Sequence, residues 1–271
     1  VNRGKDIARK IIKALNISGP FNMQFIAKNN ELKVIECNVR ASRSFPFISK
    51  VSGTNMVEVM AKVFIGEEIS ETYNTLDCGV IGIKSPVFSY NRFKGSDPVA
   101  QVEMSSTGEV ACIGRDILQT FYMSWLGVGQ QINKKVILLS VDDKYKQKLL
   151  PLVQALSNDG WQFVATGGTH EMLVNNGVQS KFVFKISDLI EPNIQRTISK
   201  REVGLIINLP KDVFSSDADS DGFKIRRLAI DFHIPLVTNF QLSEALLESL
   251  ALFHGKPFKG ESYRELVRKG G

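Results

Sequence analysis

A short run of charged and amide side chains near residue 40 has the types needed to hold a metal ion and an anion. Glu36, Asn38 and Arg40 alternate along a segment that reads as a β-strand, and Arg43 follows at its exit. Alternate residues of an extended chain face one side, so the first three side chains are expected to line up together. Burying a carboxylate beside a guanidinium without ligands is costly. Such a row of side chains is therefore expected at a site where metal ions or anionic substrates bind to it.

A β-hairpin is the element that must position this row. The run FNMQFIAKNNELKVIECNV reads as two alternating strands, joined by a turn at Lys28–Glu31. A suitable register places the side-chain oxygens of Gln24, Glu36 and Asn38 on one face. Oxygen-only ligands suit Mg²⁺ or Mn²⁺, which keep waters and bridge substrate phosphates. The hairpin therefore predicts a divalent-metal site, and the alternative is an exposed strand whose charges are merely solvated.

The two arginines extend this chemistry from a metal to an anion. Arg40 and Arg43 would hold anionic oxygens in paired hydrogen bonds and stabilise negative charge during phosphoryl transfer. They are the residues that we expect to act in catalysis, next to the metal ligands of the hairpin.

The sequence around the hairpin resembles one enzyme family closely. GPFNMQFIAKNNELKVIECNVRASRSFPFISK resembles the C-terminal end of the second ATP-grasp domain of carbamoyl-phosphate synthetase, with near-continuous agreement from Gly19 to Gly66. The resemblance resumes at PVFSYNRFKGSDPVAQVEMSSTGEVACIGRD, in which STGEV is characteristic of the family. It implies that ATP is a substrate of the full-length enzyme and that Mg²⁺ or Mn²⁺ is bound. By this resemblance, the metals are bound by Gln24, Glu36 and Asn38. The acidic substrate and its phosphates are bound by Arg40 and Arg43.

The nucleotide-gripping half of an ATP-grasp fold has no counterpart in the sequence. Its lysines, adenine pocket and glycine-rich loop are missing from these 271 residues. The chain also begins without an initiator methionine and reads as a piece of a longer protein. The resemblance therefore implies a fragment that does not synthesise carbamoyl phosphate alone. Its expected partners are the remaining synthetase domains and a glutamine amidotransferase domain or subunit.

A second group of polar side chains lies in the C-terminal half. VATGGT at 164–169 follows a predicted strand and opens a predicted helix. Two glycines let the backbone approach a ligand, and threonine hydroxyls with free helix N–H groups can hold an anion. Lysines and an asparagine, at other strand ends or on a neighbouring helix, fall at the same edge of the sheet. The alternative is that these lysines are merely solvated. The predicted set is Lys146, Thr166, Thr169, Lys185, Asn208 and Lys211.

This half resembles the methylglyoxal-synthase-like domain family, which forms the regulatory C-terminal domain of carbamoyl-phosphate synthetase. The resemblance implies that the six residues form the phosphate and polar pocket of a small-molecule effector. LLSVDDK and VATGGT also resemble the start of an inosine-monophosphate cyclohydrolase domain, whose next motif is absent here. The catalytic segment of true methylglyoxal synthases, rich in Gly and Asp, is absent too. A catalytic role for this domain is therefore not expected.

The resemblance also bears on the identity of the effector. Bacterial enzymes bind ornithine with an acid and a tyrosine, where this chain has Ser85 and Leu236 and retains only Thr238. The urea-cycle enzyme binds acetylglutamate, with a tryptophan and an asparagine in the places of Lys185 and Lys211. Two lysines suit phosphates better, which favours a UTP-type nucleotide or phosphoribosyl pyrophosphate, as in the eukaryotic pyrimidine-pathway enzyme. A urea-cycle-type synthetase regulated by acetylglutamate is the alternative.

The elements predicted before residue 130 form an α+β domain. Periodicity and turn signals predict helices at 3–15, 49–64 and 116–126, the hairpin, and short strands between 67 and 115. The polar segment GVGQQINKK, with the pattern change after it, marks the predicted boundary. The predicted domains are 1–129, the C-terminal portion of an ATP-grasp domain, and 130–271, the methylglyoxal-synthase-like domain.

Beyond this boundary the sequence alternates strands and helices. The predicted strands are 136–141, 161–166, 181–185, 204–209 and 235–239, and the predicted helices are 145–158, 170–175, 192–200, 225–232 and 242–253. Near-continuous apolar strands separated by helices predict a doubly wound, parallel sheet of five strands, in an α/β protein. Ligands of such domains bind beyond the carboxyl ends of the strands.

Composition limits the other functions that the chain could have. A hydrophobic fraction of 43% with 23% charged residues is typical of globular proteins, and no run approaches the roughly 20 apolar residues of a membrane span. The three cysteines are odd in number and share no CxxC spacing, so neither a disulfide framework nor zinc is indicated and a reducing compartment is favoured. The three histidines have no paired spacing, which argues against a metal bound by histidine. A net charge of +6 without interleaved aromatics favours small anions over nucleic acid. We expect a cytoplasmic protein, with the mitochondrion as the alternative location. We also expect the full-length protein to be an oligomer. The competing hypotheses for function are a stand-alone binding module and an independent enzyme.

Overall fold

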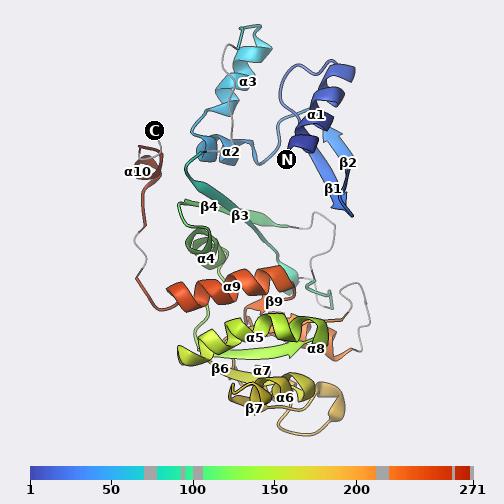
Figure 1. The fold of residues 1–271 in the computed structure, drawn as a ribbon, viewed down its shortest axis with the longest axis vertical. Coiled ribbons are helices and arrows are strands. Elements are labelled where there is room, and N and C mark those ends of the chain that lie inside the picture. The colour runs from blue at the N-terminus through green and yellow to red at the C-terminus, as the bar shows by residue number, and fades with distance from the viewer. Residues whose placement is uncertain (70–77, 93–94, 100–105, 212–219, 258–259, 269–271) are drawn as a thin grey trace. The chain divides into compact units, whose positions relative to one another are not determined.

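The computed structural model describes residues 1–69, 78–92, 95–99, 106–211, 220–257 and 260–268 (Figure 1). The chain forms two compact units. Unit 1 comprises Val1–Ile81 together with Ser262–Gly271, and unit 2 comprises Gly82–Glu261. Each unit has its own secondary structure and is described by itself.

Unit 1 contains the predicted helix and hairpin at its N-terminal end. Helix α1 spans Asn2–Ala14, and strands β1 (Asn22–Lys28) and β2 (Glu31–Asn38) pair antiparallel. Lys28 pairs with Glu31, so the turn holds two residues, Asn29 and Asn30, at φ of 50° and 61°. Asparagine tolerates this left-handed region better than most residues, which explains why it forms a two-residue hairpin turn. The helix and the hairpin are confirmed.

The single helix predicted at 49–64 is wrong, because the structure has two helices there. Helix α2 spans Phe45–Ser52 and helix α3 spans Met56–Phe64. Gly53 ends α2 in the left-handed region, at φ of 70°. Asn55 then caps α3, since its side chain accepts a hydrogen bond from the backbone N–H of Glu58. Apolar periodicity continued through both helices and hid this stop and restart. A further short helix of unit 1, α10 (Tyr263–Arg268), was not predicted.

Unit 2 begins with a two-stranded sheet and a helix. Strands β3 (Ile81–Val87) and β4 (Gly108–Gly114) pair with each other, and helix α4 (Ile117–Gly127) follows. Asp116 caps α4 by accepting a hydrogen bond from the N–H of Gln119 at 2.7 Å. The predicted helix at 116–126 and the short strands are thus present in the described residues.

A parallel sheet of five strands forms the centre of unit 2, in the order β7-β6-β5-β8-β9. The strands are β5 (Val136–Val141), β6 (Gln162–Ala165), β7 (Ser180–Phe182), β8 (Leu205–Leu209) and β9 (Leu236–Val237). All four strand pairs are parallel. The predicted fold class, α/β with a doubly wound five-stranded parallel sheet, is confirmed. The outer strands β7 and β9 are shorter than predicted, because the apolar runs continue into the loops beyond the last ladder hydrogen bonds.

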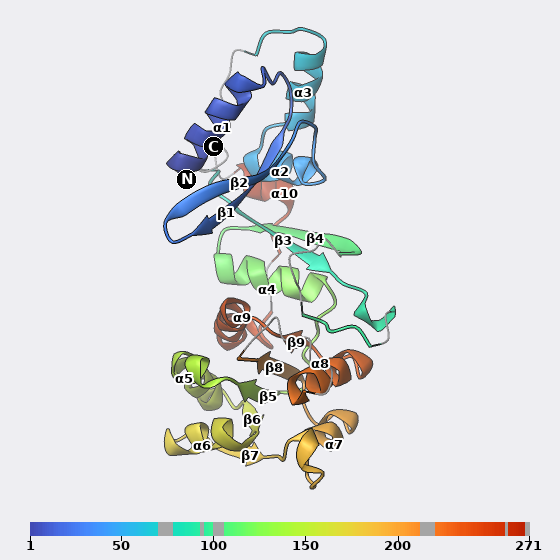
Figure 2. The ribbon, with the colours of Figure 1, turned by 90° about the vertical axis from the view of Figure 1, so that its right-hand side faces the viewer.

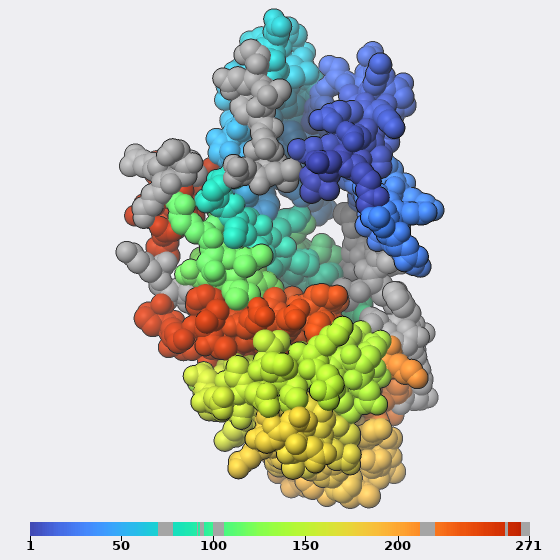
Figure 3. Space-filling view, viewed as in Figure 1, coloured from blue at the N-terminus to red at the C-terminus, as the bar shows by residue number. Residues whose placement is uncertain are grey.

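Helices cover both faces of this sheet (Figure 2). Helices α5 (Asp143–Asn158), α6 (Gly167–Asn175) and α9 (Phe240–Phe253) lie on one side, with α4 beyond α9. Helices α7 (Ile194–Ser199) and α8 (Asp221–Asp231) lie on the other. In Figure 3 the surfaces of α5 and α9 run against each other. Helix α6 starts three residues earlier than predicted, since both glycines of VATGGT are helical.

Two hydrophobic clusters follow from alternation along the strands. Ile137 and Leu139 of β5 face the cluster that includes α4, α5 and α9, whereas Leu138 faces the cluster that includes α7 and α8. Each of these three side chains is no more than 1% exposed. A strand buried on both faces reads as a continuous apolar run, as VILLSV does.

The compact units do not divide where the sequence predicted a domain boundary. The chain passes from one unit to the other after Ile81, and residues 82–129 belong to the unit of the parallel sheet. The reason is that helix α4 contributes Tyr122 and Trp125 to the core cluster on the α5 and α9 face. A division of the family's domains at residue 129 stays a prediction.

Candidate functional site

The hairpin register decides where the predicted metal ligands lie. Gln24 pairs directly with Glu36, and Asn22 pairs directly with Asn38. Directly paired residues of antiparallel strands share a face, as do residues two apart on one strand. The irregularity in the ladder lies after Gln24, toward the turn, and leaves these two pairs in register. The structure therefore brings Gln24, Glu36 and Asn38 onto one face of the hairpin.

The amide groups at this face are turned in a way that suits a cation. Asn38 Nδ2 donates a hydrogen bond to Asn22 Oδ1 at 3.3 Å. Since the nitrogen of the Asn38 amide faces Asn22, its oxygen is on the other branch, where it can bind a metal. The Glu36 carboxylate and the Gln24 amide are exposed. In the described part of the chain no three His, Cys, Asp or Glu side chains cluster, so amide oxygens are needed for any site of this kind. This donor set fits Mg²⁺ or Mn²⁺.

The two arginines lie beyond the strand. Strand β2 ends at Asn38, and Arg40 follows in a bend, with its Nη1 donating to the Ala41 carbonyl at 3.3 Å. The alternation that aligns Glu36 with Asn38 therefore does not extend to Arg40. Arg40 and Arg43 are both exposed, as is Glu36, so the burial cost that motivated the prediction does not arise within the described residues. Both guanidinium groups are accessible to an anion.

The second predicted group lies at the carboxyl edge of the parallel sheet. Thr166 follows β6 and is the N-cap residue of α6, and Thr169 lies in the first turn of that helix. They are 9% and 4% exposed, and the Thr169 hydroxyl donates to the Val141 carbonyl at the end of β5, at 3.4 Å. The hydroxyl of Thr166 is not used to cap the helix. The two threonines are thus fixed between the ends of neighbouring strands.

Lys146 brings a positive charge to the same place. Its Nζ lies 2.6 Å from Asp143 Oδ1, with the lysine side chain 14% exposed and the aspartate side chain 90% exposed. This hydrogen bond and the lysine charge lower the pKa of Asp143 below its ordinary value. A Cβ added to Gly168 would lie 2.9 Å from Lys146 Nζ. The ammonium group of Lys146 thus lies against Gly168, in the first turn of α6.

Lys185 and Lys211 are exposed, and they follow strands that are separated by β6 and β5 in the sheet. Lys185 follows β7, and its backbone N–H donates to Asp188 Oδ2 at 3.0 Å, which fixes the short turn after it. The Ser187 side chain ties this turn to Asp221 of α8 at 2.8 Å. Lys211 follows β8, and its carbonyl accepts from Lys144 Nζ of α5 at 2.7 Å. The turn after β7 is thus joined to α8, and the segment after β8 is joined to α5.

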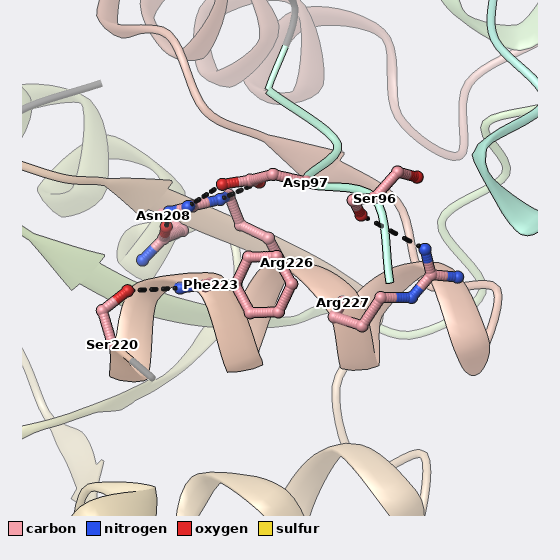
Figure 4. Close-up of polar contacts among 7 residues, drawn as sticks. All are labelled: Ser96, Asp97, Asn208, Ser220, Phe223, Arg226 and Arg227. Atoms are coloured by element: carbon pink, nitrogen blue, oxygen red, sulfur yellow. Dashed lines mark hydrogen bonds and ion pairs between the residues drawn. The ribbon is translucent and has the colours of Figure 1, made fainter. Parts of the chain in front are cut away.

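Asn208 is the most deeply buried member of the group, and its partners were missed by sequence reasoning. Its side chain is 2% exposed, and Oδ1 accepts from Arg226 Nη1 at 3.0 Å. Arg226 also pairs with Asp97 through two nitrogens, one of them at 2.7 Å (Figure 4). The only sequence signal was an arginine beside Ile225 in an amphipathic helix. Nothing in the spacing pointed to Asp97, which lies 129 positions away.

A separate cavity of about 410 Å³ lies within unit 2, among β3, α4, α8 and β9. It is lined by Ser85, Leu236 and Thr238, the three positions that the resemblance connects with ornithine. Ser85 shares a hydrogen bond with Ser124, at 2.8 Å between the hydroxyl oxygens. Among the described residues that line the cavity there is no Asp or Glu to hold an amino group. That ornithine is not the effector stays a prediction, which rests on the residue types at Ser85 and Leu236.

Two family models match the chain and define its class. Residues 4–72 match the carbamoyl-phosphate synthase L chain, ATP binding domain, and residues 148–238 match the MGS-like domain. The protein is therefore an ATP-binding-domain portion followed by an MGS-like domain. No helix in the described part of the chain combines the length and the hydropathy that a membrane crossing requires.

Curated relatives extend the match over nearly the whole chain. It is 42% identical over 261 residues to the multifunctional protein pyrABCN of Emericella nidulans, covering 93% of the chain and 12% of that protein. It is 43% identical over 252 residues to the multifunctional protein URA2 of Saccharomyces cerevisiae, covering 89% of the chain and 11% of that protein. It is 39% identical over 260 residues to the mitochondrial carbamoyl-phosphate synthase (ammonia) of Homo sapiens, covering 92% of the chain and 17% of that protein. The chain belongs to the carbamoyl-phosphate synthetase family and spans less than a fifth of the length of these relatives.

Proposed function

We propose that the chain is the C-terminal part of a glutamine-dependent carbamoyl-phosphate synthase of the pyrimidine-pathway type. The complete enzyme would join bicarbonate, ammonia from glutamine and two ATP molecules, with the second ATP phosphorylating carbamate. In this chain, unit 1 contributes the metal-binding face and two arginines, and unit 2 contributes an effector site. Remaining synthetase domains and an amidotransferase domain or subunit would complete the enzyme.

The observation that carries the catalytic half of this proposal is the hairpin register. Gln24 and Glu36 are paired, Asn38 lies on the same face, and the Asn38 amide turns its nitrogen toward Asn22. These residues would hold Mg²⁺ or Mn²⁺, which would neutralise phosphate charge during phosphoryl transfer. Arg40 and Arg43 would bind the anionic oxygens of the acidic substrate, since both are exposed directly after the strand.

The regulatory half rests on the charge at the carboxyl edge of the parallel sheet. Lys146 carries its ammonium group against the first turn of α6, while itself lying in the first turns of α5. Helix N-termini are already electropositive, so a cation placed there favours an anionic ligand. Lys185 and Lys211 add two exposed cations, after β7 and β8. Thr166, Thr169 and Asn208 supply neutral hydrogen-bonding groups, and we propose a UTP-type nucleotide or phosphoribosyl pyrophosphate as the effector.

The urea-cycle type is the second candidate, because the mitochondrial human relative matches 92% of the chain. Its effector is a dicarboxylate, whereas Lys185 and Lys211 give this edge additional positive charge suited to phosphates. Cytoplasmic location and an oligomeric full-length protein accompany the pyrimidine-type proposal, with a mitochondrial location accompanying the alternative.

The catalytic half can be tested in the complete protein that contains this chain. Formation of carbamoyl phosphate should require Mg²⁺ or Mn²⁺ and should fall strongly in Arg43→Lys, because a point charge does not replace a planar guanidinium fork. Lys50→Arg, an exchange of the same pair of residue types on α2, is the matched control and should keep the wild-type rate. Normal synthesis by Arg43→Lys would remove Arg43 from the site, and no synthesis by the unaltered protein would refute the proposed activity.

A further inference from the structure

Arg226 is a buried charge with two kinds of partner. It lies on α8, is 3% exposed, and holds the Asp97 carboxylate with two nitrogens while Nη1 donates to Asn208 Oδ1 at 3.0 Å. Figure 4 shows the guanidinium between the two groups. A guanidinium held on one side by a carboxylate has a fixed plane, so its remaining donors have fixed directions. Asn208 therefore meets a donor in a defined position.

This contact decides which end of the Asn208 amide is turned toward Arg226. Arginine has only donors, so the amide must present its oxygen to Nη1 and its NH₂ group must occupy the other branch. A phosphate has only acceptors and requires the NH₂ group. An Asn208 that lost Arg226 could turn its oxygen to a phosphate, which would repel it. The orientation of the Asn208 amide that suits an anionic effector is thus fixed by Arg226, which lies on α8.

Gly222 lies close to both side chains of this pair. A Cβ added to Gly222 would lie 3.1 Å from Arg226 Nη1 and 3.8 Å from Asn208 Oδ1. Ser220 starts α8 by accepting from the Phe223 N–H at 3.2 Å, which places Gly222 and Arg226 on consecutive turns. Glycine at 222 therefore lets the guanidinium reach the end of β8.

We propose that Arg226 is a positioning residue for effector binding, which acts through Asn208 and is itself held by Asp97. The inference rests on the proposed effector site at the carboxyl edge of the sheet. Arg226 need not touch the effector: its role is to keep the Asn208 NH₂ group available for a phosphate oxygen.

The neighbouring Arg227 offers a matched control. It lies on the same helix and also reaches the segment before residue 99, because its Nη1 donates to the carbonyls of Tyr90 and Ser96, each at 3.3 Å. Its other nitrogens bind Asp231, at 2.6 and 3.0 Å, and no described contact joins it to Asn208. Arg227→Lys should therefore also disturb the contacts of α8, without touching the amide of Asn208.

The test is a double-mutant cycle in the 271-residue chain, with phosphoribosyl pyrophosphate and UTP titrated by calorimetry. Asn208→Ala should weaken binding by about ten- to a hundredfold, the loss of one hydrogen bond to a charged acceptor. Arg226→Lys should weaken it by a similar factor, because a shorter lysine that pairs with Asp97 lacks the planar fork that also reaches Asn208 Oδ1. The double variant should bind no worse than Asn208→Ala alone. Arg227→Lys should bind within about twofold of the wild type. Should Arg226→Lys lose its cooperative thermal unfolding, Arg226→Gln takes its place in the same cycle.

Each outcome decides the proposal. Factors that multiply in the double variant would show that Arg226 acts independently of Asn208 and would overturn it. Equal weakening by Arg227→Lys would overturn it in favour of a purely structural role. Binding that Asn208→Ala leaves unchanged would also overturn it, while the effector site as such would stand. If neither ligand bound the unaltered chain, the proposed effector site would fall, and the positioning role with it.

Discussion

The hairpin of unit 1 and the carboxyl edge of the unit 2 sheet hold their polar side chains in opposite ways. On the hairpin Gln24 and Glu36 are exposed, and no described side chain from residues 1–69 is buried. At the sheet edge Thr169 and Asn208 are 4% and 2% exposed, and both have hydrogen-bond partners on other elements. The second site is therefore organised in advance by its own core. The first has the right groups in register but needs further contacts to fix them.

The cores explain this difference. Unit 2 encloses two clusters of buried apolar side chains, one on each face of the parallel sheet. In unit 1 the only described side chain that is buried is Leu266 of α10, at 4% exposure. A segment that buries little apolar surface gains little stability of its own. The small core of this segment is consistent with the proposal that it forms part of a larger domain.

The largest expected effect is on catalysis at the hairpin. In the complete protein Glu36→Gln should lower carbamoyl phosphate synthesis by about a hundredfold or more, since even outer-shell changes at metal sites cost about 10–100-fold. Folding should be unaffected, because Glu36 is exposed. Glu31→Gln, on the same strand and also exposed, is the control and should retain full activity. A normal rate for Glu36→Gln would contradict the assignment of Glu36 as a metal ligand.

The second effect concerns stability and separates the two regions directly. Ile207→Ala, at a fully buried position of β8, should lower the free energy of unfolding by about 2–5 kcal/mol. Ile35→Ala, at a hairpin position that is 56% exposed, should change it by less than about 0.5 kcal/mol. Both tryptophans, Trp125 and Trp161, lie in the core of unit 2, so urea unfolding should be followed by far-UV circular dichroism, which reports on the helices and strands of both units. Equal effects of the two variants would contradict the contrast between the regions.

The third effect concerns affinity at the sheet edge. Lys185→Ala should weaken binding of a phosphate-bearing effector by about ten- to a hundredfold, the loss of a charge-assisted hydrogen bond. Thr166→Val should weaken it less, since only a neutral hydroxyl bond is lost. Lys181→Ala removes a charge from β7, the strand that precedes Lys185, where Lys181 pairs with Glu202 at 3.1 Å, and it serves as the control in calorimetry. A larger loss in Lys181→Ala than in Lys185→Ala would place the ligand elsewhere.

The smallest expected effect is a pH dependence that belongs to unit 2 alone. Burial, followed by the charge of Lys135, lowers the pKa of His254 below its ordinary 6.5, and its Nδ1 lies 3.1 Å from the Tyr122 hydroxyl. The unfolded chain then binds more protons, so the stability is present above pH 6.5 and declines as the pH falls below it. Urea unfolding followed by tryptophan fluorescence should show this decline, and His254→Gln should flatten it. A free energy of unfolding that rises as the pH falls below 6.5 would contradict this prediction.

Much of the fold could be predicted because periodicity reports burial. VILLSV predicted β5 to the residue, and the two asparagines at 29 and 30 predicted the hairpin turn. The prediction failed where a local stop competes with apolar periodicity, as Gly53 and Asn55 do between α2 and α3. It also failed where the chain returns from far away: Asp97 and Arg226 carry no shared spacing, and only tertiary structure brings them together. Residue types at strand ends, in contrast, do indicate which side chains gather at one edge.

The identity of the ligand at the sheet edge tests the account most directly. Calorimetric titration of the unaltered 271-residue chain with UTP, phosphoribosyl pyrophosphate and acetylglutamate compares the candidates under one set of conditions. The account predicts that a phosphate-bearing ligand binds, that added salt weakens the binding, and that acetylglutamate does not bind. Binding of acetylglutamate, with no heat from either phosphate ligand, would contradict the pyrimidine-type proposal and leave the urea-cycle type in its place.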